Sequence, residues 1–245
     1  MDGFSYHDIF ATKGLEYLVI IAFLILLIPF WIVLNKQSVL RQEIQRAFGV
    51  LSAKILKVPQ GLLFAGNHTW MYMEKSGSAK IGLDDLLLHL TGKVKFTILK
   101  NPGEKINKGE LLTEIDQDGK LLHIFSPVSG IIADTNSLLK NEVGALNGDP
   151  YGRGWIYKIK PTNWIAETSH CHFADEATDW ISRELERFKD FLARSMKNSL
   201  PENAMIVMQD GGEILDHSLS AMNDVVWKDF QKEFLNPERL GTPEN

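Results

Sequence analysis

The first hydrophobic pattern of the chain is a continuous apolar run. Residues 17–34 read YLVIIAFLILLIPFWIVL, with no charge in eighteen positions. Eighteen apolar residues are enough for a helix to cross a bilayer, and Pro29 is tolerated in such a helix. A cleaved signal peptide has a shorter apolar region followed by small residues, whereas this run ends in Leu34-Asn35-Lys36. The pattern predicts an uncleaved transmembrane helix.

The charges that flank this run predict its orientation. Residues 1–16 carry one basic side chain, Lys13, among several acids. The residues after Leu34 include five basic ones: Lys36, Arg41, Arg46, Lys54 and Lys57. Basic residues favour the cytoplasmic side of a membrane. We therefore expect a single-pass protein of the inner (cytoplasmic) membrane, with residues 1–16 as a short extracytoplasmic tail and the remainder in the cytoplasm.

A linker at residues 35–62 follows the predicted span. From residue 37 to residue 51 its apolar side chains recur at helical spacing: Leu40, Ile44, Ala47, Phe48 and Leu51. This predicts an amphipathic juxtamembrane helix, which either lies on anionic lipid headgroups or packs against protein. Pro59-Gln60-Gly61 then ends the pattern.

The pattern of residues 63–161 is typical of β-structure. Stretches of strand-forming residues alternate with Gly, Pro and Asn turns, and one short helix is expected at residues 83–91. The predicted strands are 69–74, 93–99, 111–115, 121–125, 130–133 and 155–159. Many short strands with such turns favour a small sandwich or barrel.

Residues 162–245 return to helical periodicity. Residues 175–196 form an amphipathic pattern whose apolar stripe includes Ile181, Leu185, Phe188 and Leu192, and residues 220–235 predict a second helix. The tail from Asn236 is rich in Pro, Glu and Gly and is expected to fray. The stripe is a candidate docking surface for a partner, although an amphipathic stripe equally often packs in the core of its own domain.

Composition and charge exclude several classes of function. The net charge of −5 argues against a nucleic-acid surface, and the only cysteine, Cys171, excludes an internal disulfide framework. In His170-Cys171-His172 the side chains of an extended segment point alternately to opposite faces. The triplet therefore supplies too few ligands for a metal site. No nucleophile elbow, phosphate loop or paired-acid arrangement is present. We therefore predict a protein that is not an enzyme and binds no metal.

Six short motifs follow one another between Gly66 and Lys160. They are Asn67-His68-Thr69-Trp70, Ile81-Gly82-Leu83-Asp84-Asp85, Gly92, Gly109-Glu110, Ser126-Pro127-Val128-Ser129-Gly130 and Asp149-Pro150-Tyr151-Gly152-Arg153-Gly154-Trp155. Such an ordered series is far more specific than one short pattern, and it resembles the glycine cleavage H-protein family of small lipoyl carriers.

The resemblance implies a mainly β fold, the barrel-sandwich hybrid of lipoyl and biotinyl domains, between the N-terminal transmembrane helix and a C-terminal helical extension. It also implies structural roles for the motif residues His68, Trp70, Pro127, Gly130, Asp149, Pro150, Tyr151, Gly152, Gly154 and Trp155. We expect Trp70 and Trp155 to be substantially buried.

The family presents a lysine that carries lipoate at the tip of a hairpin. When residues 109–126 are aligned without a gap, Gly119 stands at that position and Lys120 lies one residue late. Asp118-Gly119 is a strong signal for a tight hairpin turn, which would not display Lys120 at its apex. We therefore predict that the chain carries no cofactor. The alternative is a lipoate on Lys120.

These features together predict a non-catalytic, membrane-anchored adaptor or accessory subunit. Its partners would be the membrane and other protein subunits, for example those of an electron-transfer complex. The first alternative is a membrane-tethered lipoyl carrier modified at Lys120. A second alternative, a periplasmic adaptor of the membrane-fusion type, requires a long coiled-coil hairpin, absent here, and the opposite orientation in the membrane.

Overall fold

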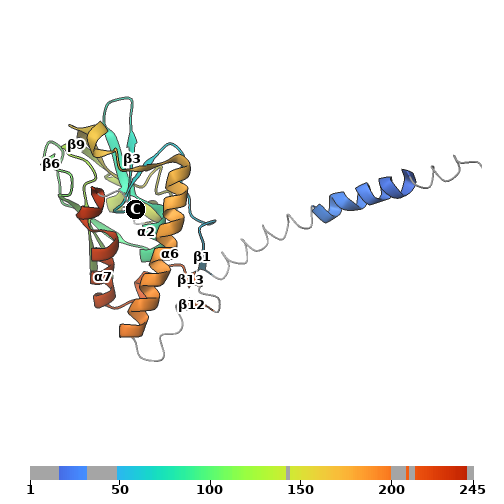
Figure 1. Ribbon diagram of the computed structural model, residues 1–245. Helices are drawn as coiled ribbons and strands as arrows, with labels where there is room; N and C mark the ends of the chain where they lie inside the picture. Colours follow the sequence, from blue (N-terminus) through green and yellow to red (C-terminus); the bar gives the residue numbers. More distant parts are fainter. Residues whose placement is uncertain (1–16, 32–48, 142–143, 200–207, 210–212, 242–245) are drawn as a thin grey trace, which may run out of the picture. The chain divides into compact units, whose positions relative to one another are not determined.

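The computed structural model describes residues 17–31, 49–141, 144–199, 208–209 and 213–241 (Figure 1). The chain divides into two units, residues 1–48 and residues 49–245. In the first unit residues 17–31 are helical, and their side chains are exposed. No helix among the residues that the structure describes is long and apolar enough to cross a membrane. Residues 32–34 of the predicted span, and most of the predicted juxtamembrane helix, lie outside the described residues.

The second unit is built on a seven-stranded antiparallel sheet. Its order is β11-β2-β3-β4-β10-β9-β6, and its strands are β2 (Leu63–Ala65), β3 (Thr69–Met73), β4 (Ala79–Leu83), β6 (Lys105–Ile106), β9 (Gly130–Thr135), β10 (Trp155–Pro161) and β11 (His172–Phe173). Trp70 of β3 is fully buried opposite Gly82 of β4. A Cβ at position 82 would lie 2.7 Å from the Trp70 ring, so this pairing requires glycine.

Two three-stranded sheets complete the β-structure. One has the order β5-β7-β8, with β5 at Lys95–Ile98, β7 at Leu111–Gln117 and β8 at Lys120–Phe125. The other has the order β1-β13-β12, with β1 at Val50–Leu51, β12 at Met208–Gln209 and β13 at Glu213–Leu215. The predicted juxtamembrane helix was expected to reach Leu51. That boundary is wrong, because Val50 and Leu51 pair with Leu215 and Ile214 as a strand.

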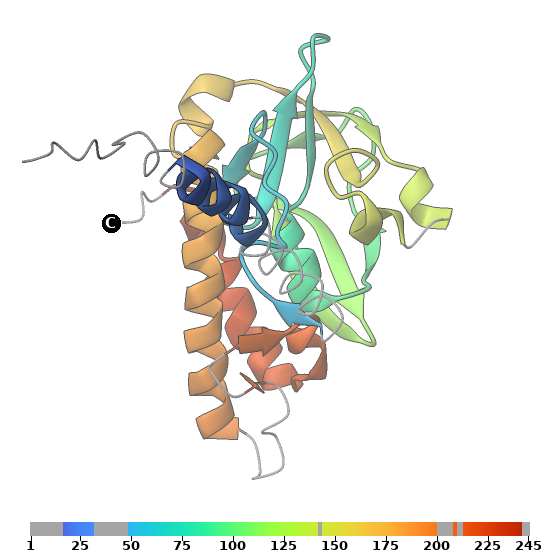
Figure 2. The same ribbon diagram turned by 90° about the vertical axis from the view of Figure 1, so that its right-hand side faces the viewer.

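Short helices connect the strands, and longer ones form the C-terminal part. The short ones are α2 (Asp85–Thr91), α3 (Leu138–Asn141), α4 (Ala145–Gly148) and α5 (Trp164–Glu167). The C-terminal part contains α6 (Ala174–Ser199), η2 (Ser218–Ala221), α7 (Asp224–Phe234) and η3 (Pro237–Leu240). Both views show α6 (orange) and α7 (red) beside each other on the β-structure (Figures 1 and 2). The helices predicted at 83–91 and 175–196 are confirmed.

One hydrophobic core joins the β-region to the C-terminal helices. Ile181, Leu185, Phe188 and Leu192 are at most 2% exposed, and Phe188 packs edge-on against Phe230 and Phe234 of α7. The interpretation of this stripe as a docking surface is therefore wrong, because its side chains fill the core of this chain. For the same reason residues 63–161 and the described residues after 162 belong to a single unit rather than two.

Two smaller expectations also need correction. The tail was expected to fray from Asn236 onwards, but residues 236–241 are ordered, because Asn236 caps η3 and Leu240 is buried. Residues 242–245 lie outside the described residues. Trp155 is only partly buried, unlike Trp70, and Lys158 Nζ lies 5.1 Å from the centre of its ring.

The motif at residues 149–155 forms a closed turn. Asp149 accepts hydrogen bonds from the backbone N–H groups of Gly152 and Arg153, at 3.0 and 2.9 Å. A Cβ on Gly154 would lie 2.8 Å from the backbone of Pro150. Tyr151 accepts a hydrogen bond from the N–H of Asp85 and donates one to the carbonyl of Lys57. The motif therefore joins the start of α2 to the segment around Lys57, which precedes β2.

The motif at residues 126–130 turns the chain from β8 into β9. Pro127 is buried, and the hydroxyl of Ser126 donates to the carbonyl of Val128 at 2.7 Å. A Cβ on Gly130 would lie 2.4 Å from the carbonyl oxygen of Lys160 in β10. Only glycine therefore allows β9 and β10 to approach this closely, which gives both motif residues structural roles.

Candidate functional site

The hairpin between β7 and β8 is where the resemblance places the carrier lysine. Gln117 pairs with Lys120, so the connecting loop has two residues, Asp118 and Gly119. Both have positive φ, 52° and 88°, as the tightest hairpin turns require. A Cβ at position 119 would meet no atom within 4 Å. The predicted tight turn is confirmed, and its exposed tip carries no lysine.

Lys120 is held by the C-terminal part of the chain. Its Nζ donates hydrogen bonds to the carbonyl oxygens of Ser220 (2.8 Å) and Met222 (2.7 Å). The same atom lies 5.5 Å from the centre of the Trp227 ring, which adds a cation–π attraction. We call these contacts the lysine clasp. Both hydrogen bonds span about 100 residues of sequence, so local sequence patterns give no sign of them.

A second contact reinforces the same face of β8. The side chain of Gln231 in α7 accepts a hydrogen bond from the N–H of His123 at 2.7 Å and donates one to its carbonyl at 3.1 Å. These two bonds pair the amide of Gln231 with the backbone of β8 as a neighbouring strand would. The result is a fixed contact between α7 and the hairpin that bears Lys120.

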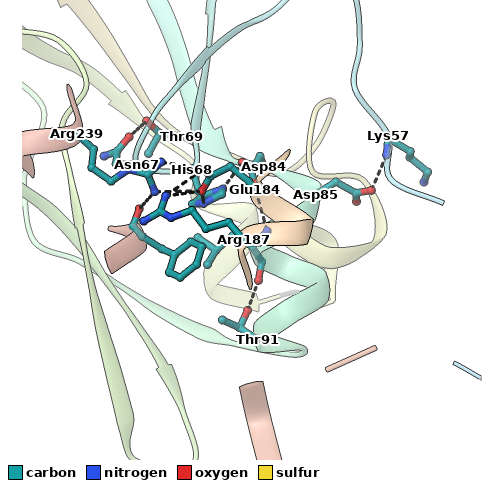
Figure 3. A network of polar contacts seen from close by, with 12 residues as sticks. Lys57, Asn67, His68, Thr69, Asp84, Asp85, Thr91, Glu184, Arg187 and Arg239 are labelled. Atoms are coloured by element: carbon teal, nitrogen blue, oxygen red, sulfur yellow. Dashed lines mark hydrogen bonds and ion pairs between the residues drawn. The ribbon is translucent and has the colours of Figure 1, made fainter. Parts of the chain in front are cut away.

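Four charged residues in the interior form the buried charge cluster: His68, Asp84, Glu184 and Arg239 (Figure 3). His68 Nδ1 lies 2.8 Å from Asp84, and His68 Nε2 lies 3.3 Å from Glu184. Arg239 of η3 reaches both oxygens of Glu184, at 3.0 and 3.1 Å. The cluster therefore ties the β3–β4 region to α6 and to the end of the chain.

Burial and charge oppose each other at His68. Burial alone would lower the pKa of this imidazole, but Asp84 and Glu184 raise the pKa to about 9. Burial tends to raise the pKa of Glu184, yet His68 and Arg239 lower it well below its ordinary value. Both directions favour the ionised forms. The side chains of His68 and Asp84 are not exposed to solvent, which indicates a structural role rather than chemistry on a substrate.

The sequence analysis did not identify Glu184 or Arg239 as members of a site. The sequence of α6 does contain one indication, which concerns Glu184. Glu184 falls on the apolar stripe of α6, three residues after Ile181 and four residues before Phe188. A charged residue on the buried face of a helix needs a partner. That position could therefore have been recognised as one end of an internal ion pair, although its partners could not.

The triplet His170-Cys171-His172 has local roles. The His172 ring stacks on Trp180 at 4.9 Å, and burial raises the pKa of Cys171 to about 11, which disfavours a reactive thiolate. Among the described residues no three His, Cys, Asp or Glu side chains gather in a group that could hold a metal ion.

Similar proteins were found by sequence and by structure. The family model for the glycine cleavage H-protein matches residues 62–183. A probable glycine cleavage system H protein of Pyrococcus abyssi is 30% identical over 125 residues, which are 51% of this chain and 92% of the relative. Its counterpart in Thermococcus kodakarensis is 33% identical over the same shares. The glycine cleavage system H protein of Psychrobacter cryohalolentis is 29% identical over 49% of this chain and 94% of its own.

A solved structure, that of a glycine cleavage system H protein from Mycobacterium marinum, is also similar. It is 24% identical in sequence, with a TM-score of 0.40, and the match covers 43% of this chain and 87% of that one. The family model matches residues 62–183, and two relatives that are at least 30% identical are covered over 92% of their length. This chain therefore belongs to the glycine cleavage H-protein family.

Proposed function

We propose that this chain is a non-carrier member of its family, a membrane-anchored adaptor or accessory subunit with no lipoyl group. The observation that carries the proposal is the lysine clasp. Lys120 donates two short hydrogen bonds to carbonyl oxygens of the C-terminal part, while Gly119 occupies the exposed tip of the hairpin. A swinging arm needs a lysine that is free at the tip, whereas Lys120 serves as an internal contact.

The relatives support one alternative, a membrane-tethered lipoyl carrier modified at Lys120. Family membership favours it, because the matching proteins are named as H proteins of the glycine cleavage system. Modification would first require the clasp to open, since both carbonyl contacts hold the amine against η2 and its C-cap Met222. The two functions therefore make opposite predictions about how readily Lys120 is acylated.

One variant tests the two functions in a single molecule, because it places a lysine at the hairpin tip beside Lys120. Gly119→Lys adds a second lysine beside Lys120, at a position with open space around its Cβ and a positive φ whose cost to a side chain is about 1 kcal/mol. The full chain is incubated with lipoate and a lipoate ligase that modifies H-proteins, and the modified residue is located by peptide mass spectrometry. We expect acylation at position 119 of the variant and none on the wild-type chain. Acylation of Lys120 in both proteins at equal rates would establish the carrier function instead.

The anchor at residues 17–34 is part of the proposal. The helix at residues 17–31 exposes large apolar side chains along its whole length, for example Leu26 at 68% and Trp31 at 63%. Such a surface is unfavourable in water and favourable in lipid. We expect the full chain to stay in the membrane fraction after a carbonate wash. A wild-type product that is soluble and begins near Asn35 would contradict the anchor.

The adaptor function implies partner subunits at the membrane, such as those of an electron-transfer complex. Purification of the native chain in a mild detergent should yield defined subunits in stoichiometric amounts. A chain that purifies alone under these conditions would contradict the accessory-subunit role.

A further inference from the structure

A groove of about 450 Å³ lies between β8 and α7, and we call it the α7 groove. Its lining residues come from the hairpin and from one face of α7: Gly119, Lys120, Leu121, His123, Asp224, Trp227, Lys228, Gln231 and Lys232. The volume is in the range of small-molecule sites. Its α7 wall lies outside the residues 62–183 that match the family, while its β8 wall lies within them.

The walls of the groove are held in place by contacts already described. Lys120 is fixed by the lysine clasp, and Gln231 is fixed by two hydrogen bonds to the backbone of His123. Trp227 is 2% exposed, and its Nε1 donates to the carbonyl of Leu219 at 2.8 Å. A site whose walls are already ordered loses less entropy when a ligand binds.

Charge in the groove is opposite in sign to that of the whole chain. The lining holds three lysines and one aspartate, a balance of three positive minus one negative, or +2, in a chain of net charge −5. Lys228 and Lys232 are four residues apart, on one face of α7. Like charges at this spacing repel each other and destabilise a helix. An anion between them would remove that repulsion.

Both lysines are exposed, and neither forms an ion pair with any residue that the structure describes. Leu121, 49% exposed, supplies an apolar surface at the same groove. Cationic groups beside an apolar wall fit a ligand that has a negative headgroup and an apolar body. We propose that the α7 groove binds a small organic anion, with its carboxylate or phosphate at Lys228 and Lys232 and its apolar body against Leu121 and the edge of Trp227.

Phenyl phosphate is a suitable probe because it joins a phosphate to an apolar ring. The full chain, in nanodiscs of the neutral lipid phosphatidylcholine, is titrated with phenyl phosphate by calorimetry. The double variant Lys228→Ala/Lys232→Ala should bind at least about tenfold more weakly, since it loses the charge-assisted hydrogen bonds to the phosphate. The matched control Lys54→Ala/Lys75→Ala removes the same charge from exposed residues outside the groove and should bind like wild type.

Three results would overturn the proposal: no binding by the wild-type chain at millimolar probe, equal binding by both double variants, or equal binding of phenyl phosphate and inorganic phosphate. Thermal unfolding of each variant shows that the domain is intact. Nanodiscs that contain phosphatidylglycerol distinguish the source of the anion. If binding of the probe is lost there, the natural ligand is a lipid headgroup, and if it is unchanged, the ligand is a free solute.

Discussion

Two of the contacts between the C-terminal part of the chain and the β-region differ in burial. At the buried charge cluster, the side chains of His68 and Glu184 are 0% and 2% exposed, and every charge lies beside an opposite one. At the lysine clasp, Lys120 is only half-buried, and its ammonium meets two carbonyl oxygens rather than an opposite charge. The removal of one member of a buried ionic group leaves an uncompensated charge, whereas water can replace a contact near the surface. We therefore expect the buried charge cluster to contribute more to the stability of the fold than the lysine clasp.

The largest effect is expected in the apolar core beside the buried charge cluster. Phe188 is not exposed and contacts aromatic rings of α7. Phe188→Glu would place an unpaired charge there, so we expect the free energy of unfolding to fall by at least about 5 kcal/mol. Urea unfolding followed by tryptophan fluorescence measures this. Ile165→Glu, at a side chain 85% exposed, is the control. A folded Phe188→Glu chain of normal stability would revive the docking-surface interpretation of α6.

The next effect tests the ionic contacts of the buried charge cluster. Glu184→Gln keeps the shape of the side chain but removes the negative charge that His68 and Arg239 share, while Asp84 stays beside His68. We expect a loss of about 3–5 kcal/mol in the free energy of unfolding. Glu186→Gln, which removes an exposed pair with Lys189, should change stability by less than about 1 kcal/mol. Equal effects of the two variants would contradict the claim that burial gives the ionic contacts of Glu184 their importance for stability.

Changes in pH should act on the buried charge cluster with a predictable sign. The pKa of His68 is raised to about 9 in the folded chain, compared with about 6.5 when unfolded. Its contribution is therefore complete below pH 6.5 and is lost as the pH rises through 9, a change on the order of 3 kcal/mol. The raised pKa of His89, beside Asp216 and Asp85, acts in the same direction.

Urea unfolding at pH 6 and pH 9.5 measures this slope. His68→Gln should reduce the loss of stability at alkaline pH, and His170→Gln, at an exposed position, should leave it unchanged. On the acid side, the lowered pKa of Glu184 predicts a further loss as the pH falls below the unfolded value of about 4.3. A free energy of unfolding that is flat between pH 6 and 9.5 would contradict the ionised state of His68.

The smallest effect is expected at the lysine clasp. Lys120→Met keeps the length and apolar stem of the side chain but removes both hydrogen bonds to η2 and its C-cap. Because Lys120 is only half-buried and its loss leaves no unpaired charge, we expect a loss of only about 1 kcal/mol, together with faster hydrogen exchange at the start of α7. Lys95→Met, at an exposed position of β5, is the control. A loss as large as that of Glu184→Gln would show that the clasp is part of the fold.

The sequence predicted the elements well because local patterns determine them. The helix at 175–196, six strands of the β-region and the tight turn at Asp118-Gly119 were recognisable from periodicity or turn chemistry, whereas the strands at 63–65, 79–83 and 105–106 were not predicted. It did not predict which surfaces the C-terminal helices cover, since an amphipathic stripe looks the same whether it faces a partner or its own core. The partners of Lys120 and Glu184 were also out of reach, because each contact joins residues far apart in the chain.

The central claim is that Lys120 is an internal contact and carries no lipoyl group. The intact mass of the full chain, purified from its own host, tests it most directly. We predict the unmodified mass, apart from any processing at the N-terminus, and peptide mapping that finds Lys120 unacylated. A lipoyl or octanoyl mass on Lys120 in most molecules, absent from a Lys120→Arg chain, would contradict the claim and establish a tethered carrier.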